Sequence, residues 1–223
     1  MIKEEVKEQQ SKMKDKSRRE KAGYFWYYYK VHVIVSVVVV IALISLVRGI
    51  VENSKVPSIY VAMVNSNLFD SSESSLVDDF ANSRKFDVDK HPAKFDVSYQ
   101  MTEGVADNTS LGSSQKLMAL LSSKDIDVLI ANEWVIKDYA EMAAFANLKE
   151  TLPDDLYEKV ADDLIYFEYE DDGKVPIGID ISDNPKITAD NTYKEDTPPI
   201  VTIGNNSERQ ETAIDFIRYL YEE

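Results

Sequence analysis

The chain has 223 residues, with 40 Asp and Glu against 25 Lys and Arg, a formal net charge of −15 and no cysteine. The lack of cysteine excludes disulfides and thiol chemistry, and a balance this acidic argues against binding to nucleic acid. The charge is unevenly distributed. Residues 1–22 contain eight Lys or Arg and five acids, whereas the part after Val51 has a net charge of about −20.

A long apolar run, YFWYYYKVHVIVSVVVVIALISLVRGIV, occupies residues 24–51. From Val31 to Val51 the only residue that is always charged is Arg48, and a helix of this length extends about 31 Å, close to the thickness of the hydrocarbon core of a bilayer. The six aromatic residues 24–29 form a belt that favours the lipid headgroup layer. The sequence therefore predicts a helix that crosses the lipid bilayer at Val31–Val51.

A cleaved signal peptide is the competing interpretation of this run. Its apolar region is usually about 7–15 residues long and ends at a small-x-small site, and no such site follows here. A permanent single-pass anchor in the cell membrane fits better. Because cytoplasmic flanks are rich in Lys and Arg, we expect residues 1–23 to form a cytoplasmic basic tail, residues 24–51 the belt and the span, residues 52–57 a linker and residues 58–223 an extracytoplasmic domain.

The remaining stretch of about 170 residues is long enough for one domain with a sizeable core. Apolar runs and helical periodicity alternate along it. They predict strands at residues 58–64, 94–99, 126–131 and 199–204, and helices at residues 70–86, 115–122, 132–145 and from Ser207 onward. Residues 103–114 and 182–199 read as loops, and Asp172-Gly173 as a hairpin turn. The expected fold is a mainly parallel three-layer α/β sheet domain that follows the transmembrane helix.

Three segments of this domain carry a resemblance: DIDVLIANEWVIKDYAEMAAFANLKE (residues 125–150), KVPIGIDI (residues 174–181) and PIVTIGNNSERQETAIDFIRYLYEE (residues 199–223). They resemble bacterial extracellular solute-binding proteins, of the type 2 periplasmic-binding-protein-like class. The resemblance implies a solute-binding fold with a role in transport. Only a polar loop and one strand separate Asp180 from Gly204, which leaves no room for a second lobe. The resemblance therefore implies a single lobe of a two-lobe fold.

Polar residues follow the predicted strands, and in an open parallel sheet ligands bind beyond the carboxyl ends of the strands. The candidate ligand-binding residues are Asn65, Asn132, Glu133, Trp134 and Asp180. Trp134 could stack on a sugar or a peptide while the polar groups donate and accept hydrogen bonds. In the alternative interpretation Asn132 is a helix cap, Trp134 packs on the sheet and Asn65 only turns the chain.

Neither a metal site nor a catalytic site is predicted. Glu168, Glu170 and Asp172 fall at the first, third and fifth positions of a calcium-binding loop, but its twelfth position is Ile179 instead of the required Glu. These acids therefore read as a solvated hairpin. No nucleophile or phosphate-binding motif occurs, and the two histidines lie at the membrane edge and before a proline. We expect no cofactor and no enzymatic activity.

Two functions fit these expectations. The first is a membrane-anchored, non-catalytic binding module similar to solute-binding proteins, with a small solute such as a sugar or a peptide. The second is a membrane-tethered adaptor that docks a partner protein of an envelope or transport complex and binds no small molecule. An aromatic-lined pocket at the strand ends would favour the first, and an exposed apolar patch the second.

Overall fold

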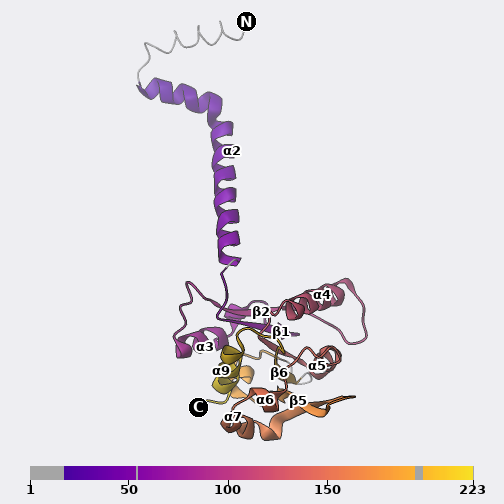
Figure 1. The fold of residues 1–223 in the computed structure, drawn as a ribbon. Coiled ribbons are helices and arrows are strands. Elements are labelled where there is room, and N and C mark those ends of the chain that lie inside the picture. The colour runs from indigo at the N-terminus through magenta and orange to yellow at the C-terminus, as the bar shows by residue number, and fades with distance from the viewer. Residues whose placement is uncertain (1–17, 54, 194–197, 223) are drawn as a thin grey trace. The chain divides into compact units, whose positions relative to one another are not determined.

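The computed structural model describes residues 18–53, 55–193 and 198–222. The chain separates into two compact units, Met1–Lys55 and Val56–Glu223, and Figure 1 shows the fold of each. The first unit contains a long helix and the second an α/β sheet domain, so each is described by itself.

Helix α2 (Arg18–Asn53) contains the predicted span. Its stretch Tyr29–Gly49 has 21 residues with a mean hydropathy of 2.7, none of it buried within the protein. Among the described residues this is the one helix long and apolar enough to cross a bilayer. Val and Ile, which dominate the stretch, are poor helix formers in water, but in lipid the backbone must satisfy its own hydrogen bonds. The helix continues to Asn53, so the first two residues of the predicted linker 52–57 are helical.

The α/β unit is built on one six-stranded sheet with the strand order β2-β1-β3-β6-β5-β4. The strands are β1 (Ile59–Val64), β2 (Ala93–Tyr99), β3 (Val128–Asn132), β4 (Leu164–Tyr169), β5 (Gly173–Asp180) and β6 (Pro199–Ile203). Strand β1 pairs in parallel with β2 and β3, whereas β3–β6, β6–β5 and β5–β4 are antiparallel. The sheet is mixed, and the expectation of a mainly parallel sheet is not confirmed.

The connections between the strands explain the antiparallel half of the sheet. The predicted turn at Asp172-Gly173 is confirmed, and Gly173 adopts a φ of 67° there. A hairpin this short makes β4 and β5 antiparallel. Between β5 and β6 the described part of the connection contains only the four-residue helix α8 (Pro185–Thr188), not the long helix that a parallel return uses. Strand β6 therefore enters the sheet antiparallel to both of its neighbours.

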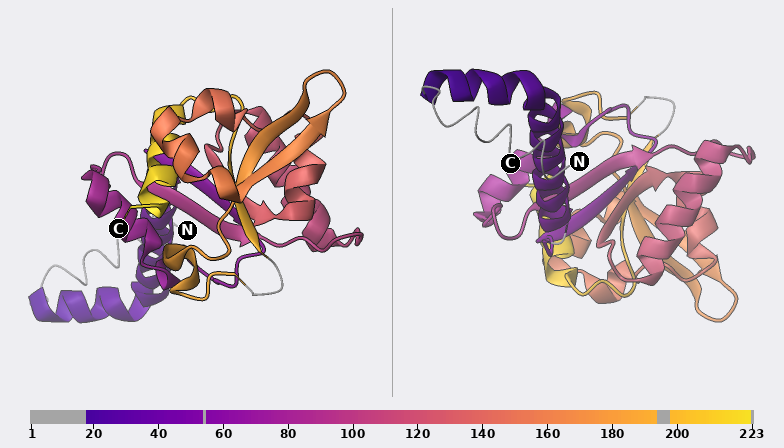
Figure 2. Two further views of the ribbon diagram at one scale, coloured as in Figure 1. Left: turned by 90° about the horizontal axis from the view of Figure 1, so that it is seen from below. Right: turned by 90° about the horizontal axis from the view of Figure 1, so that it is seen from above.

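Helices cover both faces of the sheet, which makes three layers, as expected (Figure 2). One face packs against α3 (Leu76–Arg84), α6 (Leu148–Thr151), α7 (Asp154–Lys159) and α9 (Gln210–Leu220), and the other against α4 (Asn108–Ser122) and α5 (Glu133–Ala140). Two short 3₁₀ turns, η1 (Ser71–Glu73) and η2 (Ala161–Asp163), complete the described elements of the unit. Every side chain of β1 and β3 is buried, as the continuous apolar runs predicted.

Helix α9 shows how the sequence pattern produces the packing. Ala213, Phe216, Ile217 and Leu220 recur at helical spacing and all are buried. The Phe216 ring makes edge-to-face contacts with Phe80, at 5.1 Å between ring centroids, and with a second core phenylalanine. Contacts of this geometry add to the area term of the hydrophobic effect, and they hold α9 against both α3 and strand β2.

Several helix boundaries differ from the sequence expectations: α3 is shorter than the helix expected at residues 70–86, α9 begins three residues after Ser207, and α4 and α5 also differ. The helix after Asn132 ends at Ala140 instead of Phe145, because Phe145 pairs with Gly204 beside β6 and Ala143 turns the chain with a φ of 51°. Met142, which lies in the stretch expected to be helical, is exposed. Helix α4 begins at Asn108, inside a stretch read as a loop.

The early start of α4 has a local cause. The Asp107 side chain accepts a hydrogen bond from the Ser110 backbone N–H at 2.7 Å and so satisfies one of the free donors at the helix start. Residues 103–114 are mostly polar, so the sequence pattern indicated a loop and the helix cap at Asp107 was not predicted.

Gly204 marks a place where two segments of backbone approach closely. A Cβ atom at this position would lie 2.7 Å from the Ile126 carbonyl oxygen. The Gly204 N–H donates to the Asp127 carbonyl at 2.9 Å, so the approach belongs to the strand pairing itself. Glycine is required here for space.

Candidate functional site

The carboxyl ends of four strands lie along one edge of the sheet. Strands β1, β2 and β3 are parallel, and β5 has the same direction because it and β3 are both antiparallel to β6. The chain passes from β1 to β2 on one side and then to β3 on the other, so the sheet has its switch point between β1 and β3. Ligands of open α/β sheets bind at such a point.

Asn65 and Asn132 meet at this switch point, directly beyond β1 and β3. The Asn65 Nδ2 donates to Asn132 Oδ1 at 2.9 Å, and the Asn65 Oδ1 accepts from the Met101 N–H at 2.8 Å. Asn65 has a φ of 58°, which Asn tolerates better than most residues. Asn132 stands at the N-cap position of α5 but makes no side-chain cap bond. Asn132 is therefore the cap residue of α5 by position, as the alternative interpretation expected, but its side-chain oxygen accepts from Asn65 instead of from the first turn of the helix.

A loop of the same chain lies over these strand ends. The Thr192 carbonyl accepts hydrogen bonds from the Asn67 N–H at 2.8 Å and from Ser66 Oγ at 3.2 Å. The Tyr193 hydroxyl donates to the Ile130 carbonyl inside β3 at 3.1 Å. Tyr193 is buried, and burial raises the pKa of its phenol well above its ordinary value. The protein's own residues therefore occupy the space beyond β1 and β3.

Asp180 lies at the same edge, at the end of β5, but opens into a separate cavity. Its carboxylate accepts a hydrogen bond from the Ser182 N–H at 2.9 Å. The cavity has a volume of about 410 Å³, and its lining residues are Asp163, Asp180, Ser182, Asp183, Asn184, Pro185, Leu220, Tyr221 and Glu222. The Tyr221 hydroxyl donates to Asp163 at 3.3 Å, and burial, followed by the charges of Asp163 and Asp180, raises the pKa of Tyr221. The phenol stays protonated beside carboxylates, an arrangement suited to a cationic or hydrogen-bond-donating group.

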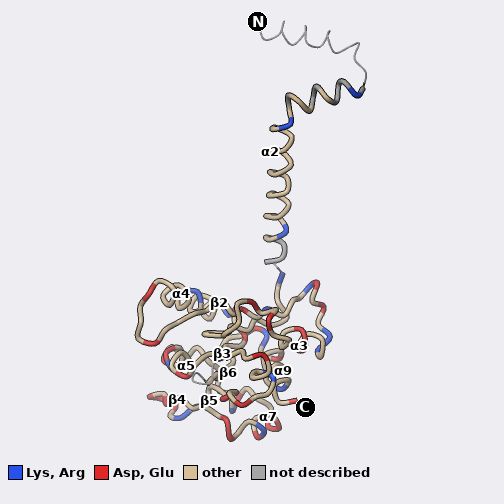
Figure 3. Tube along the Cα trace, turned by 180° about the vertical axis from the view of Figure 1, so that it is seen from behind, with Lys and Arg blue, Asp and Glu red and all other residues tan. Residues whose placement is uncertain are grey.

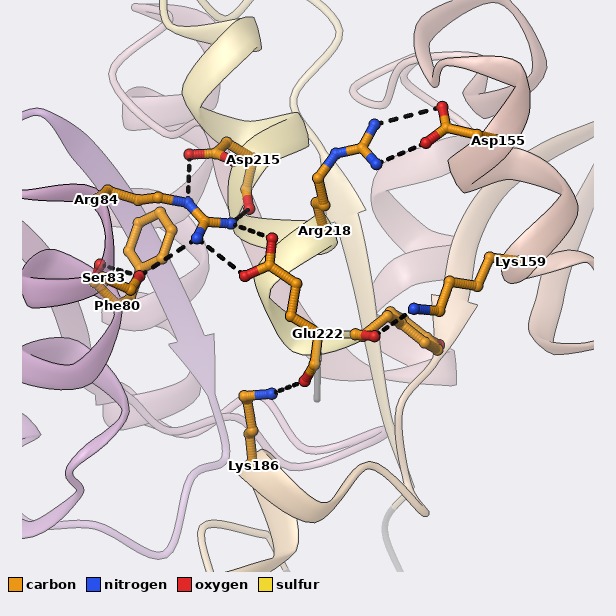
Figure 4. A network of polar contacts seen from close by, with 10 residues as sticks. Phe80, Ser83, Arg84, Asp155, Lys159, Lys186, Asp215, Arg218 and Glu222 are labelled. Atoms are coloured by element: carbon orange, nitrogen blue, oxygen red, sulfur yellow. Dashed lines mark hydrogen bonds and ion pairs between the residues drawn. The ribbon is translucent and has the colours of Figure 1, made fainter.

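One wall of this cavity is fastened by the polar network in Figure 4. The Arg84 guanidinium makes a two-pronged contact with the Glu222 carboxylate at 2.8 and 2.9 Å and an ion pair with Asp215 at 2.7 Å. Lys186 donates to the Glu222 carbonyl and Lys159 to the Tyr221 carbonyl. The bonds from Arg84 lower the pKa of Glu222. The segment that carries Tyr221 is therefore held in place by three cations.

Glu133 and Trp134 do not join these groups. Glu133 is exposed and pairs with Lys137, one turn further along α5, at 2.7 Å. Trp134 is half-buried and packs against the apolar cluster on the α5 face of the sheet, which agrees with the alternative interpretation of this residue. It does not line the cavity at Asp180. The five candidates thus divide into a bonded pair of amides, an acid in a cavity and two residues at the start of α5.

The acids of the hairpin form no metal site. Glu168 lies on β4, while Glu170 and Asp172 lie in the turn. Within residues 18–53, 55–193 and 198–222 no three His, Cys, Asp or Glu side chains are placed to hold a metal ion.

One polar network at the opposite end of β3 was missed. Asp127 is fully buried, and its carboxylate accepts bonds from the Tyr60 N–H at 2.7 Å, from Ser207 Oγ at 2.5 Å and from Arg209 Nε at 2.8 Å. These bonds join β1, β3 and the start of α9. The signal was an acid within the apolar run IDVLIA, because a charge in a buried strand needs a partner.

A second missed group lies between β1, β2 and α4. The Tyr60 hydroxyl donates to Asp96 at 2.7 Å and lies 2.9 Å from the Tyr99 hydroxyl. Lys116 on α4 pairs with Asp96 at 2.7 Å. Burial, then the hydrogen bonds, raise the pKa of Tyr60, so its phenol remains a donor to Asp96. This group fastens an outer strand to its helix.

No family model, curated protein or solved structure matches this chain. The functional argument therefore depends on the residues and contacts described above.

Proposed function

We propose that this chain is a single-pass membrane protein whose acidic α/β domain lies outside the cytoplasm and binds a partner protein. The observation that carries the proposal is the covered switch point. Asn65 and Asn132 bond each other, and the loop at Thr192 and Tyr193 covers the strand ends. A solute would have to displace these contacts, whereas a partner protein needs only the surface around them.

One exposed aromatic side chain near this edge supports docking. Phe69, in the loop after β1, is 94% exposed, the largest exposed fraction among the large apolar side chains of the described residues. The Phe69 N–H donates to the Glu73 carboxylate at 3.0 Å, so the segment that presents the ring is ordered locally. An aromatic ring of this kind is a typical anchor in protein–protein interfaces.

The orientation in the membrane is supported by charge. Lys and Arg exceed the acids before the apolar run, and the part after Val51 is strongly acidic. Because the chain has no cysteine, single cysteines report topology cleanly. We expect Ser72→Cys to react with a membrane-impermeant maleimide in intact cells and Ser11→Cys to react only after permeabilisation. The reverse pattern would overturn the orientation.

Partner binding is tested by site-specific photo-cross-linking in cells. A photo-reactive amino acid is placed at Phe69, and a matched one at Lys149, an exposed position on α6. We expect a discrete adduct with a membrane or envelope protein from Phe69, and none from Lys149 with the same partner. Equal yields from both positions, or no adduct from any exposed position of the domain, would contradict the proposal.

A second candidate function, binding of a small solute, is favoured by the cavity at Asp180. Its volume of about 410 Å³ falls within the range of small-molecule sites, and its acids would suit a solute with an amino group. A thermal-shift screen of amine-containing metabolites tests this candidate. A stabilisation that disappears in Asp180→Asn would support it, and no shift with any compound would exclude it. The resemblance to one lobe of solute-binding proteins belongs to this second candidate.

A further inference from the structure

Strand β4 is the last strand of the sheet, and β5 is its one neighbour among the described residues. Its outward backbone N–H and C=O groups therefore have no strand partner within the described part of the chain. Such an edge is a template for another strand, and proteins usually cover or interrupt it. A register shift lies between Ile165 and Tyr166, but the pairing from Tyr166 to Tyr169 is regular. Figure 2 shows the hairpin of β4 and β5 projecting beyond the rest of the α/β unit.

The side chains of β4 alternate as in a strand with one supported face. Ile165, Phe167 and Tyr169 are half-buried and pack against the cluster on the α5 side of the sheet. The rings of Phe167 and Tyr169 make an edge-to-face contact at 4.8 Å between centroids. On the opposite face Tyr166 is 48% exposed. The edge is thus held in an extended conformation and offers apolar surface to an added strand.

The charge of the β4 edge indicates which kind of segment can bind there. Residues 162–174 contain six acids and a single basic residue, Lys174. Glu168 is exposed within the strand, and Figure 3 shows acidic positions at the free end of the hairpin. The other outer strand, β2, differs, since Lys94 lies on it and Lys116 pairs with its Asp96. Opposite charges on facing strands stabilise the pairing and like charges oppose it.

We propose that the β4 edge binds an extended segment of the partner protein in which Lys or Arg alternates with apolar residues, adding a seventh strand to the sheet. A second copy of this chain is a poor occupant, because its own β4 edge carries the same excess of acids. Backbone hydrogen bonds supply affinity in this mode, and alternate side chains supply specificity. The inference rests on the proposed function and names where the partner binds and what its segment contains.

The test uses the full-length protein in micelles of a neutral detergent and a fluorescein-labelled peptide in which Lys alternates with Val. We expect binding by fluorescence anisotropy at about 150 mM salt. A peptide with Glu in place of Lys should bind at least about tenfold more weakly, because of like charge. A Lys peptide with a central Val replaced by Pro should lose a similar factor, since it keeps the charge but cannot complete a strand.

Matched variants locate the site. The double substitution Glu168→Lys and Glu170→Lys should weaken binding of the Lys peptide at least about tenfold, because it reverses the charge of the edge. The control, Asp89→Lys and Glu103→Lys, changes the net charge equally at exposed positions of two other loops and should leave binding within about twofold. Equal losses in both pairs would overturn the site.

Hydrogen exchange distinguishes an added strand from capture by charge alone. We expect the Lys peptide to slow exchange of amides in residues 164–169. Binding without this protection, or equal binding of the Pro peptide, would overturn strand addition. Cross-links to a partner from Phe69 but none from Tyr166 would leave the proposed function intact and overturn this inference.

Discussion

The two edges of the sheet, one at the amino end of β3 and one at its carboxyl end, both carry polar side chains, but these side chains are bonded in different ways. At the amino end, Asp127 is fully buried and bonds three groups of the same chain. At the carboxyl edge, Asn65 and Asn132 bond each other, while Asp180 makes one backbone bond and faces a cavity. Whether a polar residue at a strand end is structural or can bind a ligand therefore depends on how many of its hydrogen bonds come from the chain itself. The predictions below test that distinction, each in a Trp26→Phe background so that Trp134 alone reports unfolding of the domain.

The largest effect is expected at the amino end. Asp127→Ala should lower the free energy of unfolding by about 3–5 kcal/mol, because it leaves the Tyr60 N–H and the Arg209 guanidinium without their buried partner. Denaturant unfolding followed by fluorescence measures the loss. Asp127→Asn, which keeps an acceptor for the Tyr60 N–H, should lose less. A loss below about 1 kcal/mol for Asp127→Ala would show that the network is not structural.

The bonded amides at the carboxyl edge come next. Asn65→Ala should cost about 2–3 kcal/mol, because it removes the bonds to Asn132 and Met101 and places Ala at a φ of 58°. Asn65→Gly removes the same bonds without the backbone penalty and should cost about 1 kcal/mol less. The two variants are compared by denaturant unfolding. If both leave stability unchanged, the Asn65 amide is free for a ligand and the switch point is a site after all.

A pH experiment extends the comparison to Asp96. Burial opposes its charged form, but hydrogen bonds from Lys116, Ser98 and Tyr60 outweigh burial and hold the pKa of Asp96 below its ordinary value. A carboxylate whose pKa is lowered on folding stabilises the folded state. This stabilisation is fully present above the unfolded-state pKa of about 3.9, and it is lost as the pH falls through the folded-state pKa. Wild type should therefore exceed Asp96→Asn by about 1–2 kcal/mol at pH 7, and the difference should shrink below about pH 4. Glu103→Gln, at an exposed position, is the control, and a constant difference down to pH 2 would contradict the bonding.

The smallest effect is expected at Asp180. Asp180→Asn should change the free energy of unfolding by less than about 0.5 kcal/mol, because the carboxylate is half-exposed and its one bond to the Ser182 N–H can be kept by the amide. Thermal unfolding compares it directly with Asp127→Asn. A loss as large as that of Asp127→Asn would remove the contrast between the two ends.

The sequence predicted those parts of the fold that depend on local pattern. The buried strands β1 and β3, the hairpin at Gly173 and the apolar face of α9 all follow from periodicity or turn chemistry. The direction of β6 could not be read, because strand direction is set by how the connection returns across the sheet.

The candidate site was harder to predict, because it too depends on contacts between segments that are far apart in the sequence. Asn65, Asn132 and Asp180 each lie at the carboxyl end of a strand, so the sequence correctly predicted that they share one edge of the sheet. The pairing of Asn65 with Asn132, 67 residues apart, and the cover supplied by the loop at Thr192 are long-range contacts that no local pattern encodes. Asp127 was recognisable in principle, since a lone acid in an apolar strand needs a buried partner.

The close approach at Gly204 has an evolutionary consequence. A single methyl group there would press on the Ile126 carbonyl oxygen and force β6 away from the entrance of β3. Even alanine should be rejected in a saturation library selected for folding, while neighbouring loop positions tolerate many residues. A distant relative that has diverged elsewhere is expected to keep glycine at this point, and it would serve as a fixed landmark for aligning the two chains.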